Sequence, residues 1–412
     1  MRILMLAHRI PYPPHTGDKV RAYHVARHLA RHHELTLAFL VDEAADLAGI
    51  GPLREITPQI EFAPLSKPWG VIKGLAGLAV GGSLTQPYFA SRRLRGGVDR
   101  RMAAADYDLV YVSSSPMAQY VARVEMPVVM DFVDVDSDKW SQYSQRARPP
   151  LRWLYRAESA GLRRYEAWIA RWARLCLLST PVEEALLKSF APWAKTAVVP
   201  NGVDVESYAP VASASSTPTL IFTGAMDYRP NIDAVVHFCT DVFPLIRREV
   251  PEARFLIVGL NPAPAVTALS ALPGVVVTGA VPDVRPFYAE AAIAVAPLRM
   301  ARGVQNKVLQ AMAMGLPVVA STLAAAGLSA RPGQHLLAED RPASFAARVV
   351  HLLKTPADRS ELGRQARAFV EAHHSWEAAF LRLDHLLAHT VNARGTRSPA
   401  PSKVALGLER LR

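Results

Sequence analysis

Residues 301–319 read Ala-Arg-Gly-Val-Gln-Asn-Lys-Val-Leu-Gln-Ala-Met-Ala-Met-Gly-Leu-Pro-Val-Val and join the two kinds of element from which the chain is built. Apolar residues recur at helical spacing over 304–314, which predicts a helix. Gly315 and Pro317 then end that helix and lead into a short apolar strand at 317–320. A buried strand directly after a helix is typical of a parallel α/β sheet.

The same alternation runs through most of the 412 residues. Further strands are expected at 3–7, 35–41, 109–112, 128–130, 175–178, 219–223, 255–258, 275–278 and 293–296, and helices at 19–33, 231–249, 284–291 and 342–390. Residues 209–218 interrupt this pattern with small and polar residues, a composition typical of a linker. The length and this interruption predict two doubly wound α/β domains joined near 200–218.

The composition excludes several classes of protein. Half of the residues are hydrophobic and 20% are charged, which excludes a disordered chain or a fibre. The two cysteines, Cys176 and Cys239, lack the spacing of a zinc site or a disulfide framework. No apolar run reaches the roughly 18 residues of a membrane span, and residues 1–8 turn polar too early for a secretory signal. We therefore expect a cytoplasmic protein.

The net charge of +11 is concentrated in two segments. Residues 146–174 carry a net charge of +6 and residues 391–412 carry +4, so the rest of the chain is nearly neutral. The tail at 391–412 contains Pro and Ser, and we expect it to be disordered. Such local charge fits an anionic membrane surface, another polyanion or no partner, and we expect no nucleic-acid partner.

The quoted segment also has features of a phosphate site. Gly303 allows close approach of a ligand where the chain leaves a strand, and Lys307 lies in the first turn of the expected helix. Gln310, three residues on, shares a face with Lys307. Together they could hold a diphosphate and a neighbouring hydroxyl group. The alternative is a solvated Lys and Gln on an ordinary crossover helix.

Several motifs resemble one enzyme family. Val-Pro-Asn-Gly-Val-Asp at 199–204, Thr-Gly-Ala-Met-Asp-Tyr-Arg-Pro-Asn at 223–231 and the segment 301–319 resemble motifs of the family 4 glycosyltransferases. Val-Met-Asp-Phe-Val-Asp-Val-Asp-Ser-Asp-Lys-Trp at 129–140 and Pro-Pro-His-Thr-Gly-Asp-Lys at 13–19 resemble sugar transferases of exosortase (PEP-CTERM) and exopolysaccharide systems. The resemblance implies the GT-B fold, with two doubly wound Rossmann-like domains that face each other across a cleft.

The resemblance also implies a division of labour along the chain. It implies an acceptor-binding domain at 1–200, a linker at 201–218, a nucleotide-sugar-binding domain at 219–371, a helix at about 372–390 that packs back on the first domain, and the tail at 391–412. The implied activity moves a hexose, with retention, from a nucleoside diphosphate sugar to a polyprenyl-linked or growing exopolysaccharide acceptor. It needs no cofactor and no obligatory metal. Because a polyprenyl-linked acceptor stays in the bilayer, we expect peripheral association with the inner face of the cell membrane.

The implied donor-site residues depart from the family at two positions. Donor binding is expected from Gly224, Arg229, Gly279, Val281, Arg302, Gly303, Asn306, Lys307 and Gln310. Arg302 and Gln310 stand where the family usually has glutamates. We interpret this as a variant donor site, because Gly303, Asn306 and Lys307 persist. A nucleotide-sugar epimerase of the same architecture and a non-catalytic protein that binds sugar nucleotides or glycans are the alternatives.

Acidic residues follow the expected strand at 128–130. A carboxylate there could orient or deprotonate an acceptor hydroxyl group, and Asp134 is the first candidate and Asp131 the second. The alternatives are capping of a helix by Asp136 or Ser137 and, less favoured, a metal-binding acid pair. After the first strand, His15, Gly17 and Lys19 are the expected acceptor-binding residues.

Two surface segments complete the sequence predictions. The stretch at 67–80 is apolar, has Trp69 near its start and is followed by arginines at 92–101. This pattern is typical of either a membrane interface or a core-facing helix. The same two interpretations apply to 151–174. His24, His28 and His32 share one helix face among arginines, which we interpret as a solvated basic face.

Overall fold

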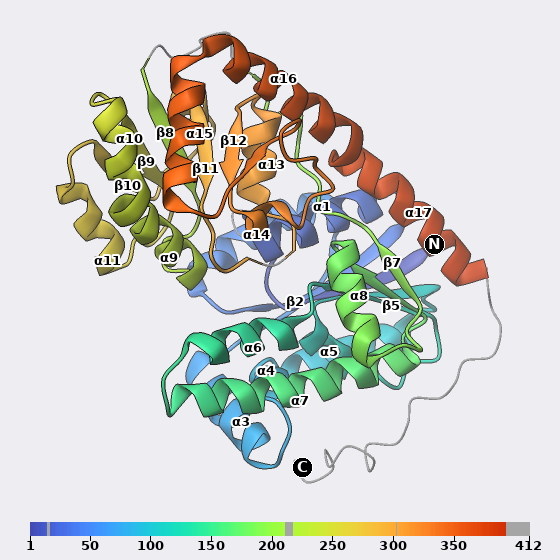
Figure 1. The fold of residues 1–412 in the computed structure, drawn as a ribbon. Helices are drawn as coiled ribbons and strands as arrows, with labels where there is room; N and C mark the ends of the chain where they lie inside the picture. The colour runs from blue at the N-terminus through green and yellow to red at the C-terminus, as the bar shows by residue number, and fades with distance from the viewer. Residues whose placement is uncertain (15–16, 211–216, 302, 393–412) are drawn as a thin grey trace. The chain divides into compact units, whose positions relative to one another are not determined.

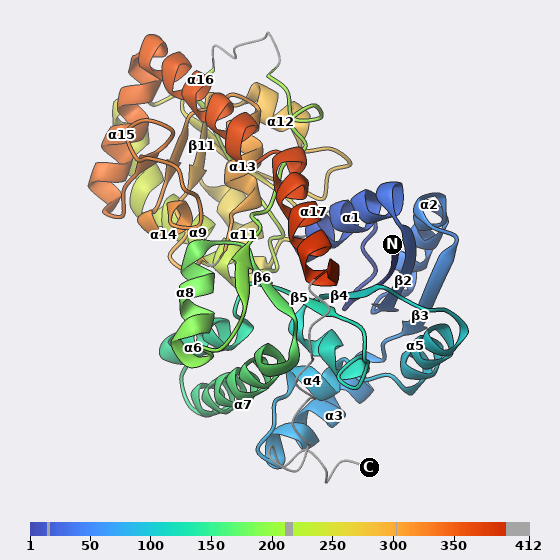
Figure 2. The same ribbon diagram turned by 90° about the vertical axis from the view of Figure 1, so that its right-hand side faces the viewer.

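The computed structural model describes residues 1–14, 17–210, 217–301 and 303–392, which divide into two compact units (Figure 1). The first unit holds the described residues up to Val199 and those from Phe380 onwards, and the second runs from Pro200 to Ala379. Each unit is a parallel sheet with helices on both faces (Figures 1 and 2), which confirms the predicted doubly wound architecture.

In the described part of the first unit, seven parallel strands lie in the order β3-β2-β1-β4-β5-β6-β7. The strands are β1 (Arg2–Ala7), β2 (Glu34–Val41), β3 (Gln59–Pro64), β4 (Leu109–Ser113), β5 (Val128–Val133), β6 (Leu175–Leu178) and β7 (Thr196–Val198). The α-helices are α1 (Gly17–His32), α2 (Ile50–Ile56), α3 (Lys67–Ala79), α4 (Thr85–Tyr88), α5 (Arg92–Ala104), α6 (Asp136–Arg146), α7 (Leu151–Trp172) and α8 (Pro181–Phe190). Strands β4 and β6 are buried along their whole length, because helices cover both faces of the sheet.

The second unit repeats this plan. Its described residues form six parallel strands in the order β10-β9-β8-β11-β12-β13. The strands are β8 (Thr219–Thr223), β9 (Arg254–Val258), β10 (Val275–Gly279), β11 (Ile293–Ala296), β12 (Val318–Ala320) and β13 (Leu337–Ala338). The α-helices are α9 (Arg229–His237), α10 (Phe243–Glu249), α11 (Pro264–Thr267), α12 (Arg285–Glu290), α13 (Asn306–Ala313), α14 (Thr322–Ala325), α15 (Pro342–Lys354) and α16 (Pro356–His373).

The strand order places the ligand-binding edge of each sheet. Connections leave in opposite directions from β1 and β4 in the first unit and from β8 and β11 in the second. Ligands of doubly wound sheets bind beyond the carboxyl ends of the strands at such a switch point. The segments that follow these strands are therefore where functional side chains are expected.

The differences from the predicted elements occur at sheet edges and helix ends. Strands β3, β7 and β13 were not predicted, because β3 contains polar residues and ends on Pro64, while β7 and β13 are very short. The predicted helix at 231–249 contains a π-helical turn over Phe238–Val242 between α9 and α10. The stretch at 342–390 forms three helices. The second of them, α16, starts with Pro356. At the start of the third helix, the hydroxyl group of Ser375 accepts a hydrogen bond from the N–H of Ala378.

That last helix, α17 (Trp376–Asn392), belongs to the first unit from Phe380 onwards. His28 of α1 lies 2.7 Å from Asp384 Oδ1 and stacks on the ring of Phe380 with 4.2 Å between ring centres. The predicted solvated face at His24, His28 and His32 is therefore wrong at its centre, because α17 covers His28. The tail predicted at 391–412 lies outside the described residues beyond Asn392.

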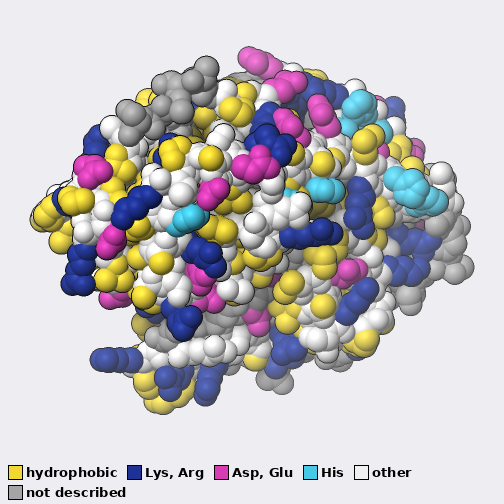
Figure 3. Space-filling view, turned by 45° about the horizontal axis from the view of Figure 1, so that its top comes forward, with side chains coloured by type: hydrophobic (Ala, Val, Ile, Leu, Met, Phe, Trp, Pro, Cys, Tyr) yellow, Lys and Arg dark blue, Asp and Glu magenta, His cyan; other side chains and the backbone are white. Residues whose placement is uncertain are grey.

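Several charged side chains on the described surface of the second unit form pairs. Lys354 pairs with Glu249, and Arg254 pairs with Glu290. On the face of the molecule in Figure 3, basic and acidic side chains are interspersed over much of the surface. Such exposed pairs contribute little to stability.

No helix of the described residues has the length and apolar character needed to cross a bilayer.

Close packing against α7 leads to a prediction. A methyl group at Gly161 of α7 would lie 1.9 Å from Gly82 O, whereas one at Gly96 of α5 would meet nothing closer than 3.7 Å. Gly161→Ala should lower stability by about 2 kcal/mol, the typical cost of overpacking, and Gly96→Ala should raise it by up to ~1 kcal/mol. Urea unfolding of both variants measures the difference, and equal stabilities would contradict the α7 packing.

Candidate functional site

Three elements of the second unit meet at the carboxyl end of β8. Lys307, in the first turn of α13, donates a hydrogen bond of 2.5 Å from Nζ to Oδ1 of Asn231 in α9. The same amine lies 4.2 Å from the centre of the Phe222 ring in β8. One basic group is therefore positioned by a strand and by the two helices that follow the switch-point strands β8 and β11.

The Lys307 amine sits in an unusual electrostatic environment. Burial lowers its pKa to about 7, since removal from water penalises the ammonium form. The partner at Asn231 is a neutral amide rather than a carboxylate. The helix α13 also begins here, with Gln305 as its N-cap and no side-chain cap, so its first-turn N–H groups and positive dipole end lie beside the amine. This arrangement favours an anionic ligand.

Two glycines keep side chains away from this amine. A methyl group on Gly224, which has a φ of 153°, would lie 2.6 Å from Asn231 Nδ2 and 3.2 Å from Lys307 Nζ. A methyl group on Gly259, at the end of β9, would lie 1.6 Å from Gly224 O. The backbones after β8 and β9 are therefore in direct contact, and only glycine fits at both positions.

Gln310 lies one turn along α13, between two tyrosines. Its Nε2 donates a hydrogen bond of 3.0 Å to Tyr208 Oη, and its Oε1 lies 3.4 Å from Tyr288 Oη. Tyr288 is buried, and its hydroxyl group also lies 2.7 Å from Thr223 Oγ1. Burial raises the pKa of Tyr208 to about 12 and also raises the pKa of Tyr288, so both hydroxyl groups are neutral donors or acceptors.

The remaining predicted donor residues lie at the ends of the same strands. Arg229 is the first residue of α9 and is exposed. Gly303 has a φ of 57°, and Asn306 Oδ1 lies 3.5 Å from Asn201 Nδ2. Gly279 ends β10 and Val281 follows it, on the edge strand of the sheet, two strands away from β8. Arg302 lies outside the described residues.

Sequence reasoning missed two residues of this site. Asn231 holds the Lys307 amine, and Tyr288 contacts Gln310. Asn231 ends the 223–231 motif, so its position could have drawn attention to it. Tyr288 carries no signal in a single sequence, because only the fold brings α12 beside α13.

In the first unit, Asp131 is buried among strong partners. Arg21 of α1 donates to both carboxylate oxygens at 2.8 and 3.1 Å, and the Tyr111 hydroxyl group donates to Asp131 Oδ2 at 2.5 Å. Arg21 also donates to Val199 O at 2.9 Å. Burial keeps the pKa of Tyr111 well above its usual value, so this phenol remains a donor. Asp131 thus ties together α1, β4, β5 and the end of the first unit.

Asp134 lies just beyond Asp131 on a sharp turn and is only partly buried. The intervening Val133 has a φ of 65°, and Asp134 N donates to Phe132 O at 2.8 Å, which makes a γ-turn. Positive φ is costly for a β-branched residue, and such strain often marks functional sites. The hydroxyl group of Ser179 donates to Asp134 Oδ1 at 2.6 Å and fixes one carboxylate oxygen.

Buried glutamates hold the segment after this turn. Glu183 accepts from Val135 N at 2.8 Å, and Glu166 of α7 accepts from Ser137 N at 3.1 Å. Burial raises the pKa of Glu166 to about 8, so its protonated form predominates at neutral pH. The alternative that Asp136 or Ser137 caps the helix is wrong, because α6 has Val135 as its N-cap and no side-chain cap.

The predicted acceptor residues behave differently from one another. Gly17 is the first residue of α1. Lys19 is buried and its Nζ lies 2.6 Å from Asp46 Oδ2, so its charge is already neutralised within the first unit. His15 lies outside the described residues. The described part of the chain contains no group of three or more His, Cys, Asp or Glu residues placed to hold a metal ion.

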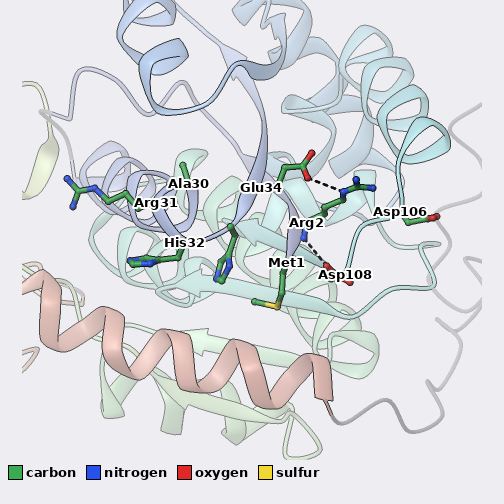
Figure 4. A pocket seen from close by; sticks show the side chains of 9 residues that line it. Met1, Arg2, Ala30, Arg31, His32, Glu34, Asp106 and Asp108 are labelled. Carbon is green, nitrogen blue, oxygen red and sulfur yellow. Dashed lines mark hydrogen bonds and ion pairs between the residues drawn. The ribbon is translucent and has the colours of Figure 1, made fainter.

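A hollow on the first unit lies away from these residues (Figure 4). It lies at the amino-terminal ends of β1 and β2, where Arg2 donates from its backbone to Asp108 Oδ2 and from its side chain to Glu34 Oε2. Ligands of parallel α/β sheets bind at the opposite edge. We therefore place the candidate site at the carboxyl ends.

Comparisons with known proteins bear on the fold and on the second unit. Residues 217–355 match the family described as Glycosyl transferases group 1. The chain is similar in fold to sucrose-phosphate synthase from Thermosynechococcus elongatus, with a TM-score of 0.72 and 18% identity over 95% of this chain and 100% of that one. No curated protein matches the sequence.

Two further solved structures have the same architecture. Anabaena HepE in complex with UDP-glucose has a TM-score of 0.67 and 15% identity, and the match covers 94% of this chain and 100% of that one. TarM, from S. aureus, has a TM-score of 0.67 and 7% identity, over 94% of this chain and 98% of that one. The predicted GT-B fold is confirmed. The chain is a glycosyltransferase with this fold, and its second unit carries the group 1 glycosyl transferase domain.

Proposed function

We propose that the second unit binds a nucleoside diphosphate sugar, with the diphosphate between the backbone at Gly224, the first turn of α13 and the amine of Lys307. The observation that carries this proposal is the desolvated Lys307 amine, which faces a neutral partner at a helix start. The HepE structure with UDP-glucose, and the match to the group 1 family, support the same class of donor here.

The proposed chemistry follows from this geometry. When the sugar leaves, the bond between its anomeric carbon and a diphosphate oxygen breaks, and negative charge grows on the leaving diphosphate. Protonated Lys307 and the first-turn N–H groups of α13 would stabilise that charge more strongly than in water, because they are positioned in advance and partly desolvated. Arg229, at the start of α9, is the proposed second cation.

We propose that Gln310 contacts a ribose hydroxyl group of the donor. Its amide is held by Tyr208 and Tyr288, so it can present a fixed neutral partner where the family has a carboxylate. Membership of the family 4 glycosyltransferases and retention of configuration belong to the same proposal. They rest on the resemblance of the motifs at 199–204, 223–231 and 301–319, and the anomeric configuration of the product tests the retention.

For the acceptor, we propose a polyprenyl-linked or growing glycan of an exosortase-associated exopolysaccharide system. Asp134 is the proposed group that orients or deprotonates the acceptor hydroxyl group, because its carboxylate lies on a strained turn at the carboxyl end of β5. A polyprenyl-linked acceptor stays in the bilayer. The proposal therefore includes peripheral association with an anionic membrane surface at the inner face of the cell membrane.

An assay with membrane extract tests the proposed reaction. Radiolabelled nucleotide-sugars are incubated with the protein, with and without extract, and the lipid fraction and the donor are analysed separately. Transfer of label to extractable lipid supports the proposal. A changed donor sugar without extract would indicate an epimerase, and binding without any conversion would indicate a non-catalytic protein.

Loss of the Lys307 amine should weaken donor binding. Lys307→Met should raise the Kd for UDP about 30-fold, or ~2 kcal/mol, which is typical of a lost hydrogen bond to a charged group. Lys354→Met, which removes a surface amine from the same unit, should leave the Kd unchanged. Titration calorimetry measures both variants, and an unchanged Kd in Lys307→Met would place the diphosphate elsewhere.

The lowered pKa of Lys307 predicts a pH dependence of stability without ligand. The unfolded chain binds the Lys307 proton up to about pH 10.5, while the folded chain releases it near pH 7. Burial of the amine therefore lowers the free energy of unfolding most below about pH 7, and this loss becomes smaller as the pH rises. From about pH 6.5 to about pH 9.5, the wild type should gain about 3 kcal/mol relative to Lys307→Met. Parallel urea titrations at both pH values measure this, and a pH-independent difference would mean that the amine is solvated.

Replacement of Gln310 by glutamate should be tolerated. Both tyrosine hydroxyl groups can turn to donate to a carboxylate, and a carboxylate accepts a ribose hydroxyl group more strongly than an amide does. Gln310→Glu should therefore melt cooperatively and bind a UDP-sugar by about 1 kcal/mol more tightly, whereas Gln310→Met should bind more weakly. Loss of cooperative melting in the glutamate variant alone would place residue 310 in the packed core.

A further inference from the structure

Helix α3 packs with its glycines inward. A methyl group at Gly74 would lie 2.8 Å from Leu84 Cγ, and one at Gly77 would lie 2.6 Å from Pro87 Cγ. Gly70 is equally close to the ring of Tyr88. These glycines recur at helical spacing and form one face of α3, which fits closely against α4 and the residues around it.

The opposite face of α3 carries large apolar side chains in solvent. Their exposed fractions are far above those of a core-facing helix: Trp69 63%, Val71 47%, Ile72 55%, Leu75 48%, and Val80 44% just after the helix. An ordinary amphipathic helix buries such residues and exposes polar ones, so the polarity of α3 is inverted. In contrast, Leu162, Tyr165, Ile169 and Trp172 of α7 are buried, so the core-facing interpretation is confirmed for α7 and wrong for α3.

This exposed face also lacks charge. Lys73 is the single charged residue from Trp69 to Val80, and its Nζ donates to Ala90 O while desolvation lowers its pKa. Trp69 stands in the first turn, and aliphatic residues fill the rest of the face. Tryptophan at one end of a short apolar helix is typical of the interface between the headgroups and the acyl chains of a bilayer.

Basic residues follow the segment that packs against α3, and another lies at the end of that helix. Arg92 and Arg93 open α5, four and five residues after Tyr88, and both are exposed. Arg164 of α7 is exposed and donates to Gly81 O, next to Val80. In Figures 1 and 2, α3 lies at the outer edge of the first unit, below α7. An uncharged apolar face with cations beside it complements an anionic bilayer.

We propose that α3 lies in the interface of an anionic membrane, with Trp69, Ile72 and Leu75 inserted below the headgroups. Arg92, Arg93 and Arg164 then contact lipid phosphate groups. The inference rests on the membrane association included in the proposed function and uses no residue of the donor site. At 13 residues, α3 is too short to span the bilayer, so insertion is shallow.

Vesicle co-sedimentation of the full chain tests the apolar contact. Ile72→Gln/Leu75→Gln should bind phosphatidylcholine–phosphatidylglycerol vesicles at least about tenfold more weakly than the wild type, since burial of apolar side chains supplies most of such partitioning. The matched control, Val182→Gln/Leu381→Gln, replaces two exposed apolar residues of the first unit outside α3 and should bind like the wild type. Equal binding of the two double variants would overturn the proposal.

A second set of variants separates the electrostatic contribution to vesicle binding from the contribution of apolar insertion. Arg92→Gln/Arg93→Gln/Arg164→Gln should weaken binding and reduce its dependence on salt, whereas wild-type binding at high salt should still exceed that of Ile72→Gln/Leu75→Gln. The Trp69 contribution to fluorescence, taken as the difference between the wild type and Trp69→Phe, should shift to the blue with vesicles. The absence of that shift would contradict insertion.

The sedimentation coefficient without vesicles tests the competing occupant. If Ile72→Gln/Leu75→Gln converts a wild-type dimer into a monomer, α3 contacts a second copy of the chain and the proposal is overturned. All variants should bind UDP like the wild type, because their substitutions lie in the first unit. A loss of vesicle binding with UDP binding intact thus concerns α3 alone, and a failure of UDP binding in every protein concerns the donor site alone.

Discussion

The rest of the structure depends on one constraint. Charged groups at the carboxyl ends of the two parallel sheets are removed from water. In a doubly wound unit both faces of the sheet are covered, and some charged groups at the strand ends are removed from water as well, Asp131 in the first unit and the Lys307 amine in the second. Each of them needs a partner, because an unpaired buried charge is costly. The two units meet this requirement in different ways.

In the first unit the buried charges of Arg21 and Asp131 neutralise each other. Arg21 and Asp131 are both almost fully buried and pair through two hydrogen bonds, with Tyr111 as a third partner. Because these three side chains bond to one another, they fix the backbone of β5. The strained turn at Val133 follows directly, and Asp134 is held on it by Ser179. Rigid support of this kind positions a side chain at the cost of local strain.

In the second unit the corresponding charge is not neutralised by a carboxylate. Lys307 has an amide and an aromatic ring as neighbours, and its pKa falls towards 7. An ammonium group in such a place stabilises the folded chain poorly without an anion and strongly with one. The contrast between a paired charge in one unit and an amine without a carboxylate partner in the other supports the proposal that the second unit binds the donor. Helix α3 is a comparable case for apolar surface. Its large side chains face solvent while its glycines are packed.

The sequence by itself determined the two doubly wound domains, most of the central strands and the position of Lys307 at the start of α13. Apolar runs and helical spacing are local properties that a single chain displays directly. Only the tertiary structure decided which side chains are partners. The burial of Asp131 against Arg21, and the contacts of Lys307 with Asn231 and of Gln310 with Tyr288, join residues 22 to 110 positions apart. It also decided which face of α3 is packed, because glycines and larger apolar residues are interspersed along that helix and the sequence pattern alone fits either orientation. Partners across such distances are set by how strands and helices stack, and no spacing along the chain encodes that arrangement.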